Sequence, residues 1–204
     1  MAGNGQETEA KFYVLHPGEI VSRLEKRDAA LIQPRVLETN LRFDLPDGSL
    51  TSEGKVLRLR KDTQARLTFK GAGQNTSGVL DRQEIEFVVE EEGKARQFLE
   101  ALGYRKSAYY EKYRATYEMD NTLIMLDELP FGNFVEIEGQ TVEQIQSVAA
   151  KLGLHWDSAI PSSYTALFKN VKQRLQLSFS DISFENFRGI EVQADHLQVR
   201  PADL

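Results

Sequence analysis

Alternation of hydrophobic and polar residues is the dominant pattern along this chain, and it predicts a protein built mainly of β-strands. Successive side chains of a strand point to opposite faces, so a strand with one apolar face repeats every two residues. Segments with this repeat cover residues 7–15, 35–45, 55–61, 65–71, 82–90, 107–119, 122–129 and 133–138. We therefore expect about eight strands.

Hydrophobic residues spaced three and four apart predict helices between some of these strands. The predicted helices cover residues 19–31, 93–102, 141–152 and 161–171. Thr141 is a candidate N-cap, and Gly153 stands where the helix that follows Thr141 would end. The small polar run of residues 71–78 predicts a loop. Residues 172–204 predict a loop-rich tail with one or two strands, over residues 175–179 and 190–192.

The polar faces of the predicted strands carry many charges, and pairs of like sign recur from strand to strand. Water-facing strand positions usually mix polar residues, because like charges that lie close together on a sheet repel each other. The charged faces hold the acids Glu7, Glu9, Glu84, Glu86, Asp127, Glu136 and Glu138, and the bases Lys11, Arg58, Arg60, Arg66, Lys70, Lys112 and Arg114. Arg42 shares such a face by its parity.

Two interpretations of these charged faces stay open from periodicity alone. In the first, they are the solvated side of an antiparallel sheet. In the second, the sheet closes on itself, helices cover its apolar outside, and the charges line a channel. Charges inside a closed sheet must balance or bind compensating ions, and the two sets above are equal in number. Such a channel would accept divalent cations together with a polyanion of the length of a triphosphate.

Composition narrows the classes of function. The 204 residues fit one domain with an appendage, and the net charge of −6 argues against duplex nucleic acid as the main partner. The absence of cysteine excludes thiolate chemistry, and the three histidines are far apart in the sequence. Any metal site would therefore be made of carboxylates, which bind hard cations such as Mg²⁺ or Mn²⁺. No glycine-rich phosphate loop is present, so side chains would have to bind any phosphate.

The expected location is the cytoplasm. No apolar run approaches the roughly 20 residues that a membrane-spanning helix needs, and we expect no membrane partner. The first seven residues lack both the basic and the apolar parts of a signal peptide.

Six short motifs follow one another between residues 7 and 139. They are Glu7-Thr8-Glu9-Ala10-Lys11, Leu57-Arg58-Leu59-Arg60, Leu67-Thr68-Phe69-Lys70, Arg82-Gln83-Glu84-Ile85-Glu86, Glu111-Lys112-Tyr113-Arg114 and the segment of residues 126–139, LDELPFGNFVEIEG. Together they resemble the motifs of the CYTH domain, also called the triphosphate tunnel metalloenzymes. The resemblance implies an α+β fold, in which an eight-stranded antiparallel closed β-barrel forms a tunnel with helices packed on its outside. It covers residues 1–171 and leaves residues 172–204 as an extension of unknown role.

The resemblance also implies a function, namely the divalent-metal-dependent hydrolysis of a triphosphate in the tunnel. The substrate would be inorganic tripolyphosphate or a nucleoside or thiamine triphosphate, and the cofactor Mg²⁺ or Mn²⁺. The alternative is a class IV adenylyl cyclase, which converts ATP to cyclic AMP and pyrophosphate. Both activities need the same metal and phosphate contacts, so the motifs do not separate them.

Carried over by position, the resemblance assigns roles to the charged residues. The implied metal ligands are Glu7, Glu9, Asp127, Glu136 and Glu138. The implied phosphate-binding residues are Lys11, Arg58, Arg60, Lys70, Lys112 and Arg114. The implied catalytic residues are Glu7, Glu9, Lys11, Glu136 and Glu138. Glu84, Glu86 and Arg66 are expected in the tunnel without a defined role.

Two functions without catalysis also stay open. A polyphosphate or nucleotide sensor would bind the same polyanion, although four carboxylates beside it disfavour this function. An RNA-binding module would use the aromatic and basic residues that alternate near residues 109–117. Tyr109, Tyr113 and Tyr117 lie opposite Lys112 and Arg114 by parity, so we expect no nucleic-acid partner. The apolar residues of the tail predict packing against the domain or a contact in a homodimer.

Overall fold

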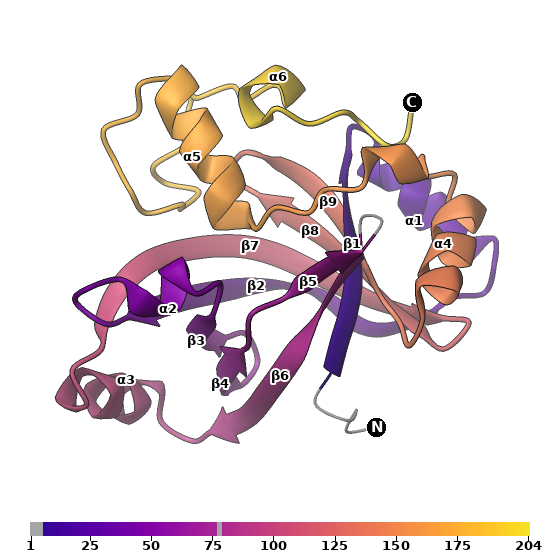
Figure 1. Ribbon diagram of the computed structural model, residues 1–204. Coiled ribbons are helices and arrows are strands. Elements are labelled where there is room, and N and C mark those ends of the chain that lie inside the picture. Colours follow the sequence, from indigo (N-terminus) through magenta and orange to yellow (C-terminus); the bar gives the residue numbers. More distant parts are fainter. Residues whose placement is uncertain (1–5, 77–78) are drawn as a thin grey trace.

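The computed structural model describes residues 6–76 and 79–204 (Figure 1). In this part of the chain the strands are β1 (Gln6–Val14), β2 (Ala30–Asp44), β3 (Val56–Lys61), β4 (Ala65–Lys70), β5 (Gln74–Thr76), β6 (Val79–Val89), β7 (Arg105–Met119), β8 (Thr122–Leu129) and β9 (Gly132–Glu138). The helices are α1 (Pro17–Glu25), α2 (Ser49–Ser52), α3 (Glu92–Ala101), α4 (Val142–Lys151), η1 (Trp156–Ser158), α5 (Tyr164–Arg174) and α6 (Ala194–Leu197).

The sheet is antiparallel and closes into a ring. Its strand order is β1-β9-β8-β7-β2-β3-β4-β6, and β6 pairs with β1 to complete the circle. The short β5 pairs with residues 79–81 of β6, whereas β4 pairs with residues 84–89 of the same strand. A closed sheet has no exposed edge strand at which another chain could add. The expected eight-stranded closed sheet with helices on the outside is therefore confirmed.

Helices α1 and α4 cover the outside of the ring at β1, β8 and β9, and they lie side by side in Figure 1. The side chains of Phe12, Ile124 and Ile137 point outward from these strands and pack with Leu24 of α1 and Ile145 of α4, all fully buried. Helix α3 covers the ring elsewhere, at β3 and β4, through a smaller cluster around Leu59 and Leu99. The apolar faces predicted from alternation are therefore the outside of the ring.

One end of the ring is filled by apolar side chains. Tyr13 of β1 and Phe134 of β9 pack there with Tyr164 and Phe168 of α5. The backbone N–H of Ala202 donates to the carbonyl oxygen of Tyr13 at 2.8 Å, which ties the tail to β1. The tail thus packs on the ring, which is one of the two arrangements expected for residues 172–204.

A glycine permits the close approach of β9 to β1 at this end. Gly132 has a φ of 146°, and a Cβ atom there would stand 2.7 Å from the ring of Tyr13. Both the backbone conformation and the lack of space exclude a side chain at this position. The glycine of the Pro130-Phe131-Gly132 turn is therefore required by packing.

The first predicted helix, over residues 19–31, was too long. Helix α1 ends at Glu25, and β2 already begins at Ala30. Asp28 adopts a φ of 53°, a left-handed conformation that a helix cannot continue through. The strand then passes Pro34, where shifts in the pairing with β7 accommodate a residue that has no N–H to donate.

The predicted tail strands were also wrong, and so was the uninterrupted loop at residues 71–78. All of residues 172–204 are described, and residues 175–179 and 190–192 form no strand there. Gln176 has a φ of 53°, which interrupts an extended conformation, and the apolar residues of both segments pack against the ring end instead. Residues 74–76 form β5, whereas residues 77 and 78 lie outside the described part.

Among the described residues, no helix is long and apolar enough to cross a membrane.

Candidate functional site

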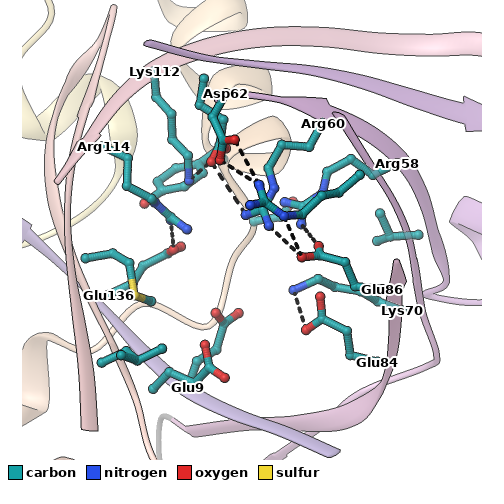
Figure 2. Close-up of a pocket in the computed structure, with 18 of the residues that line it drawn as sticks. Glu9, Arg58, Arg60, Asp62, Lys70, Glu84, Glu86, Lys112, Arg114 and Glu136 are labelled. Atoms are coloured by element: carbon teal, nitrogen blue, oxygen red, sulfur yellow. Dashed lines mark hydrogen bonds and ion pairs between the residues drawn. The ribbon is translucent and has the colours of Figure 1, made fainter. Parts of the chain in front are cut away.

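A cavity of about 770 Å³ occupies the inside of the ring, and charged side chains dominate its lining (Figure 2). The basic lining residues are Lys11, Arg42, Arg58, Arg60, Arg66, Lys70, Arg82, Lys112 and Arg114. The acidic lining residues in the described part of the chain are Glu9, Glu38, Asp62, Glu84, Glu86, Glu136 and Glu138. Of the two interpretations of the charged faces, the interior one is therefore correct.

Strands β1 and β9 form the acidic side of the cavity. Glu9 pairs directly with Glu138, and Lys11 pairs directly with Glu136. The Nζ atom of Lys11 lies 3.2 Å from Oε1 of Glu136, and Arg82 contacts the carboxylate of Glu9 at 3.3 Å. Two carboxylates in direct cross-strand positions repel each other, so the Glu9–Glu138 pair favours a bound cation.

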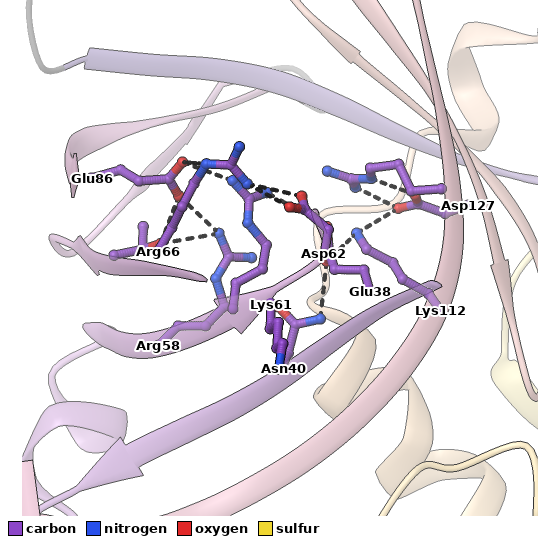
Figure 3. Close-up of polar contacts among 12 residues, drawn as sticks. Glu38, Asn40, Arg58, Lys61, Asp62, Arg66, Glu86, Lys112 and Asp127 are labelled. Atoms are coloured by element: carbon purple, nitrogen blue, oxygen red, sulfur yellow. Dashed lines mark hydrogen bonds and ion pairs between the residues drawn. The ribbon is translucent and has the colours of Figure 1, made fainter. Parts of the chain in front are cut away.

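Strands β3 and β4 form the basic side, where three arginines surround the carboxylate of Glu86. Glu86 of β6 lies 2.7 Å from Arg60 (Figure 2), and 3.6 Å from Arg58 and 3.8 Å from Arg66 (Figure 3). Thr68 also donates its hydroxyl to Glu86 at 2.7 Å. In this arrangement the buried Nε atoms of Arg58 and Arg60 have no hydrogen-bond partner. Buried donors without partners are costly, so this side is suited to receive the oxygen atoms of an anion.

A buried ion cluster joins the two sides at the apolar end of the ring. Asp127 is 1% exposed and accepts hydrogen bonds from Lys112 at 2.9 Å, Arg114 at 2.6 Å and the Tyr164 hydroxyl at 2.8 Å. Arg114 also pairs with Glu136. This cluster fixes the positions of Lys112 and Arg114 relative to the acidic side.

The family of the protein follows from comparison with known sequences. The CYTH domain model matches residues 5–163, more than three quarters of the chain. The chain belongs to the CYTH family. Enzymes of this CYTH family depend on a metal in general.

Individual CYTH relatives agree with this assignment. A Methanocaldococcus jannaschii protein, provisionally named an adenylate cyclase, is 24% identical over 172 residues, which cover 79% of this chain and 97% of the relative. The X-ray structure of a Vibrio parahaemolyticus protein with the same provisional name shares the fold at a TM-score of 0.73 and 21% identity, over 81% of this chain and 99% of that one. HpAC1 from Hippeastrum, a provisional adenylyl cyclase described as having a dominant triphosphatase activity, shares the fold at a TM-score of 0.61 and 19% identity, over 80% and 95% of the two chains.

Most residues expected at the site are found together in the CYTH tunnel. All implied phosphate-binding residues line it, and so do Glu9, Glu136, Glu138, Glu84, Glu86 and Arg66. Asp127 is not among the described lining residues, because it is buried behind Lys112 and Arg114. Glu7 pairs with Arg82 in the strand register, but its side chain lies outside the described part of the structure, so its expected role stays a prediction.

Two acids of the tunnel were not predicted as site residues. Glu38 is 1% exposed and accepts a hydrogen bond from Asn40 at 2.9 Å, while Lys112 and Arg60 lie 3.4 and 3.6 Å away. Residues 38, 40 and 42 alternate with more apolar neighbours, and this alternation could have placed Glu38 on the charged face of its strand. Asp62, which binds Arg66 at 2.9 Å, lies in the turn between β3 and β4, where alternation carries no information.

Opposite charges control the protonation of the tunnel residues. Burial alone would raise the pKa of Glu38, but Lys112, Arg114 and Arg60 lower it well below its ordinary value. Burial would lower the pKa of Lys11, yet the attraction of Glu136 and Glu9 raises it. These groups therefore stay charged at neutral pH inside the ring.

The residues of the acidic side fit a hard divalent cation. Glu9, Glu136 and Glu138 supply carboxylate oxygens, which Mg²⁺ and Mn²⁺ prefer. A cation would also relieve the repulsion between Glu9 and Glu138, which are direct partners in the sheet. Within the described residues no three His, Asp or Glu side chains are already gathered as a metal cluster, so binding would require the carboxylates to approach each other.

Proposed function

We propose that this CYTH protein is a divalent-metal-dependent triphosphatase, which cleaves a terminal phosphoanhydride bond with water and releases phosphate. The observation that carries the proposal is the division of the tunnel into two sides. A cross-strand carboxylate pair, Glu9 and Glu138, stands on one side, and buried guanidinium groups without full hydrogen bonding stand on the other. A triphosphate with its metal is complementary to both sides at once.

The guanidinium groups of Arg58 and Arg60 would bind the phosphate oxygens. An arginine fork matches two oxygens of a phosphate, and its charge cannot be removed by titration. Both residues now pair with Glu86, so a phosphate would replace this carboxylate as the partner. Lys70, Lys11 and Lys112 would add point charges along the chain of phosphates, and Arg114 would add a further guanidinium group.

Glu9, Glu136 and Glu138 would hold the metal, with Glu7 as the further candidate from the sequence. When bound, a divalent ion neutralises phosphate charge and lowers the pKa of a coordinated water. Phosphoryl transfer depends mainly on positioning and on neutralising charge. The fixed register of β1 and β9 positions these carboxylates, and Lys11 beside Glu136 limits the net charge of the acidic side.

The contacts of Asp127 favour a positioning role over direct metal binding. Both of its carboxylate oxygens already accept hydrogen bonds from Lys112 and Arg114, and Tyr164 donates to one of them. Burial and the nearby charge of Asp127 raise the pKa of the Tyr164 hydroxyl well above its ordinary value, so that it remains a donor. We therefore propose that Asp127 holds the side chains of Lys112 and Arg114 in the positions at which they would bind the phosphates.

Product analysis tests the proposed reaction. We expect the protein to release inorganic phosphate from tripolyphosphate or from a nucleoside triphosphate in the presence of Mg²⁺ or Mn²⁺, and to lose this activity in EDTA. Adenylyl cyclase is the second candidate, because relatives carry that name. Formation of cyclic AMP and pyrophosphate from ATP, without phosphate release, would replace the triphosphatase proposal with the cyclase.

Replacing Arg60 with alanine is expected to weaken triphosphate binding by about 10- to 100-fold, the loss typical of hydrogen bonds to a charged group. Calorimetric titration with tripolyphosphate in EDTA measures this Kd. Arg60→Lys should recover part of the affinity, because it restores the charge without the fork. Arg96→Ala on α3, which removes an exposed arginine paired with Glu100, is the control and should leave the Kd unchanged. An unchanged Kd in Arg60→Ala would contradict the assignment of the basic side.

A further inference from the structure

A second cavity lies outside the ring, between helix α1 and strands β2, β7 and β8. Its volume is about 330 Å³. Its apolar lining includes Val21 of α1, Leu31 and Pro34 of β2, Ala115 and Tyr117 of β7, and Leu126 of β8. Leu126 belongs to the apolar cluster on the outside of the ring, and Val21 and Tyr117 pack against that cluster. We call this space the outer cavity.

The outer cavity has the size and the surface of a site for a small aromatic molecule. An apolar protein cavity of about 150 Å³ accepts benzene, so a cavity about twice as large accepts a molecule of two fused rings. Leu31 is 52% exposed, which leaves apolar surface open to solvent at this place. A ligand that covers such surface is stabilised by the hydrophobic effect.

The charges of the outer cavity are already paired. Among the described residues of its lining, the charged ones are Arg35, Asp127 and Glu128. Arg35 donates Nε and Nη2 to the two carboxylate oxygens of Glu128 at 2.7 and 2.8 Å, and Asp127 accepts from Lys112 on the tunnel side. A charged ligand would lose its hydration here without gaining a partner of opposite charge. The lining therefore favours an uncharged molecule.

The outer cavity and the tunnel share a segment of β2. Leu31 and Pro34 line the outer cavity, whereas Ile32 and Gln33 between them line the tunnel. The pairing of this segment with β7 shifts in register between Leu31 and Gln33, and again between Gln33 and Val36. Such irregular pairing disrupts the ladder of hydrogen bonds that fixes the backbone of a strand. A ligand packed on the outer pair would therefore hold the inner pair in place.

We propose that the outer cavity is an effector site for a small uncharged aromatic molecule, whose binding strengthens the binding of a polyanion in the tunnel. A ligand that has already ordered the shared segment lowers the entropy cost that a second ligand pays there. By linkage, the polyanion strengthens the binding of the aromatic molecule by the same factor. The effector role rests on the proposed triphosphatase function, whereas the binding of the aromatic molecule does not.

Calorimetric titration with indole, an uncharged molecule of two fused rings, tests the site. We expect one saturable site per chain. Leu31→Ser should raise the Kd for indole about tenfold, the usual effect of losing apolar contact in a pocket. Ala115→Leu should abolish binding, because the larger side chain fills the cavity. Thermal melting of both variants shows that they remain folded.

Two control variants locate the bound indole. Leu37→Ser is matched to Leu31→Ser, because Leu37 lies on the same strand and is 41% exposed, but it is not among the described lining residues of either cavity. Leu123→Ser removes an exposed apolar side chain of the tunnel. Both controls should bind indole as the unchanged protein does. Weaker binding in Leu123→Ser, or unchanged binding in Ala115→Leu, would overturn the proposal.

A pair of probes of equal size tests the preference for an uncharged ligand. Benzamide is neutral and benzoate is an anion, and both carry the same ring. We expect benzoate to bind at least about tenfold more weakly than benzamide, because the cavity offers its charge no free partner. Tighter binding of benzoate would show that Arg35 is available to anions, and the proposed class of ligand would be wrong.

Titration with tripolyphosphate in EDTA, with and without saturating indole, tests the effector role. We expect indole to lower the Kd for tripolyphosphate at least about fivefold, the lower end of typical couplings between two sites. Ala115→Leu should remove this difference. An unchanged Kd would overturn the effector role. If the unchanged protein bound no tripolyphosphate, the proposed function and the effector role would fail together, and the indole titrations would decide the binding site alone.

Discussion

Glu138→Gln is expected to lower kcat for triphosphate hydrolysis by at least about 100-fold, more than the usual cost of disturbing the surroundings of a metal ligand. Glu138 pairs directly with Glu9, and the two carboxylates form the core of the proposed metal site. The amide keeps the size of the side chain but removes the negative charge that attracts the cation. Phosphate release at saturating substrate, over a series of Mg²⁺ concentrations, measures the effect.

The fold should tolerate Glu138→Gln, because the substitution removes repulsion between two facing carboxylates. The melting temperature is therefore expected to stay the same or to rise. Glu143→Gln is the control, since Glu143 is exposed at the start of α4 outside the ring, and its activity should equal that of the unchanged protein. Full activity of Glu138→Gln would mean that the acidic pair does not hold the metal.

Asp127→Asn is expected to destabilise the protein by about 3–5 kcal/mol, the cost of removing one partner from a buried ion cluster. The side chain of Asp127 is completely buried, and it is the shared partner of Lys112 and Arg114. The amide would leave Lys112 with Glu38 and Arg114 with Glu136 as their remaining carboxylate partners. Urea unfolding gives the change in the free energy of unfolding.

The control for Asp127→Asn is the same substitution in an exposed ion pair. Asp120 binds Lys151 at 2.7 Å, and both side chains are about half exposed. Asp120→Asn should therefore cost no more than about 1 kcal/mol. If Asp127→Asn were equally mild, then Asp127 would not be the centre of the buried cluster, and its positioning role would be wrong.

The ring and its charged interior could be predicted because each strand has one apolar and one charged face. A period of two is a local property of the backbone, so it appears in the sequence without knowledge of the fold. Glu9, Arg58 and Glu136 were placed correctly for this reason. Whether the charged face looked outward or inward depended on closure between β1 and β6, which alternation does not record. The equal numbers of acids and bases were compatible with closure, and the family resemblance implied it.

Other features depended on contacts that are distant in sequence. Asp62 enters the tunnel from a turn, where side-chain direction follows from the turn geometry. The buried position of Asp127 arises from Lys112, Arg114 and Tyr164, which come from another strand and from α5. In the tail, apolar residues such as Leu177 and Phe179 alternated as in a strand but pack irregularly against the end of the ring. Hydrophobic pattern alone does not separate these two outcomes.

The central claim is that acidic and basic side chains from different strands bind one triphosphate and its metal inside the ring. A crystal structure with tripolyphosphate and Mn²⁺ tests it most directly, because anomalous scattering locates the manganese. We predict manganese between the carboxylates of Glu9 and Glu138, and phosphate oxygens on the guanidinium groups of Arg58 and Arg60. Manganese and tripolyphosphate bound elsewhere on the surface, with the ion pairs between Glu86 and these arginines unchanged, would contradict the claim.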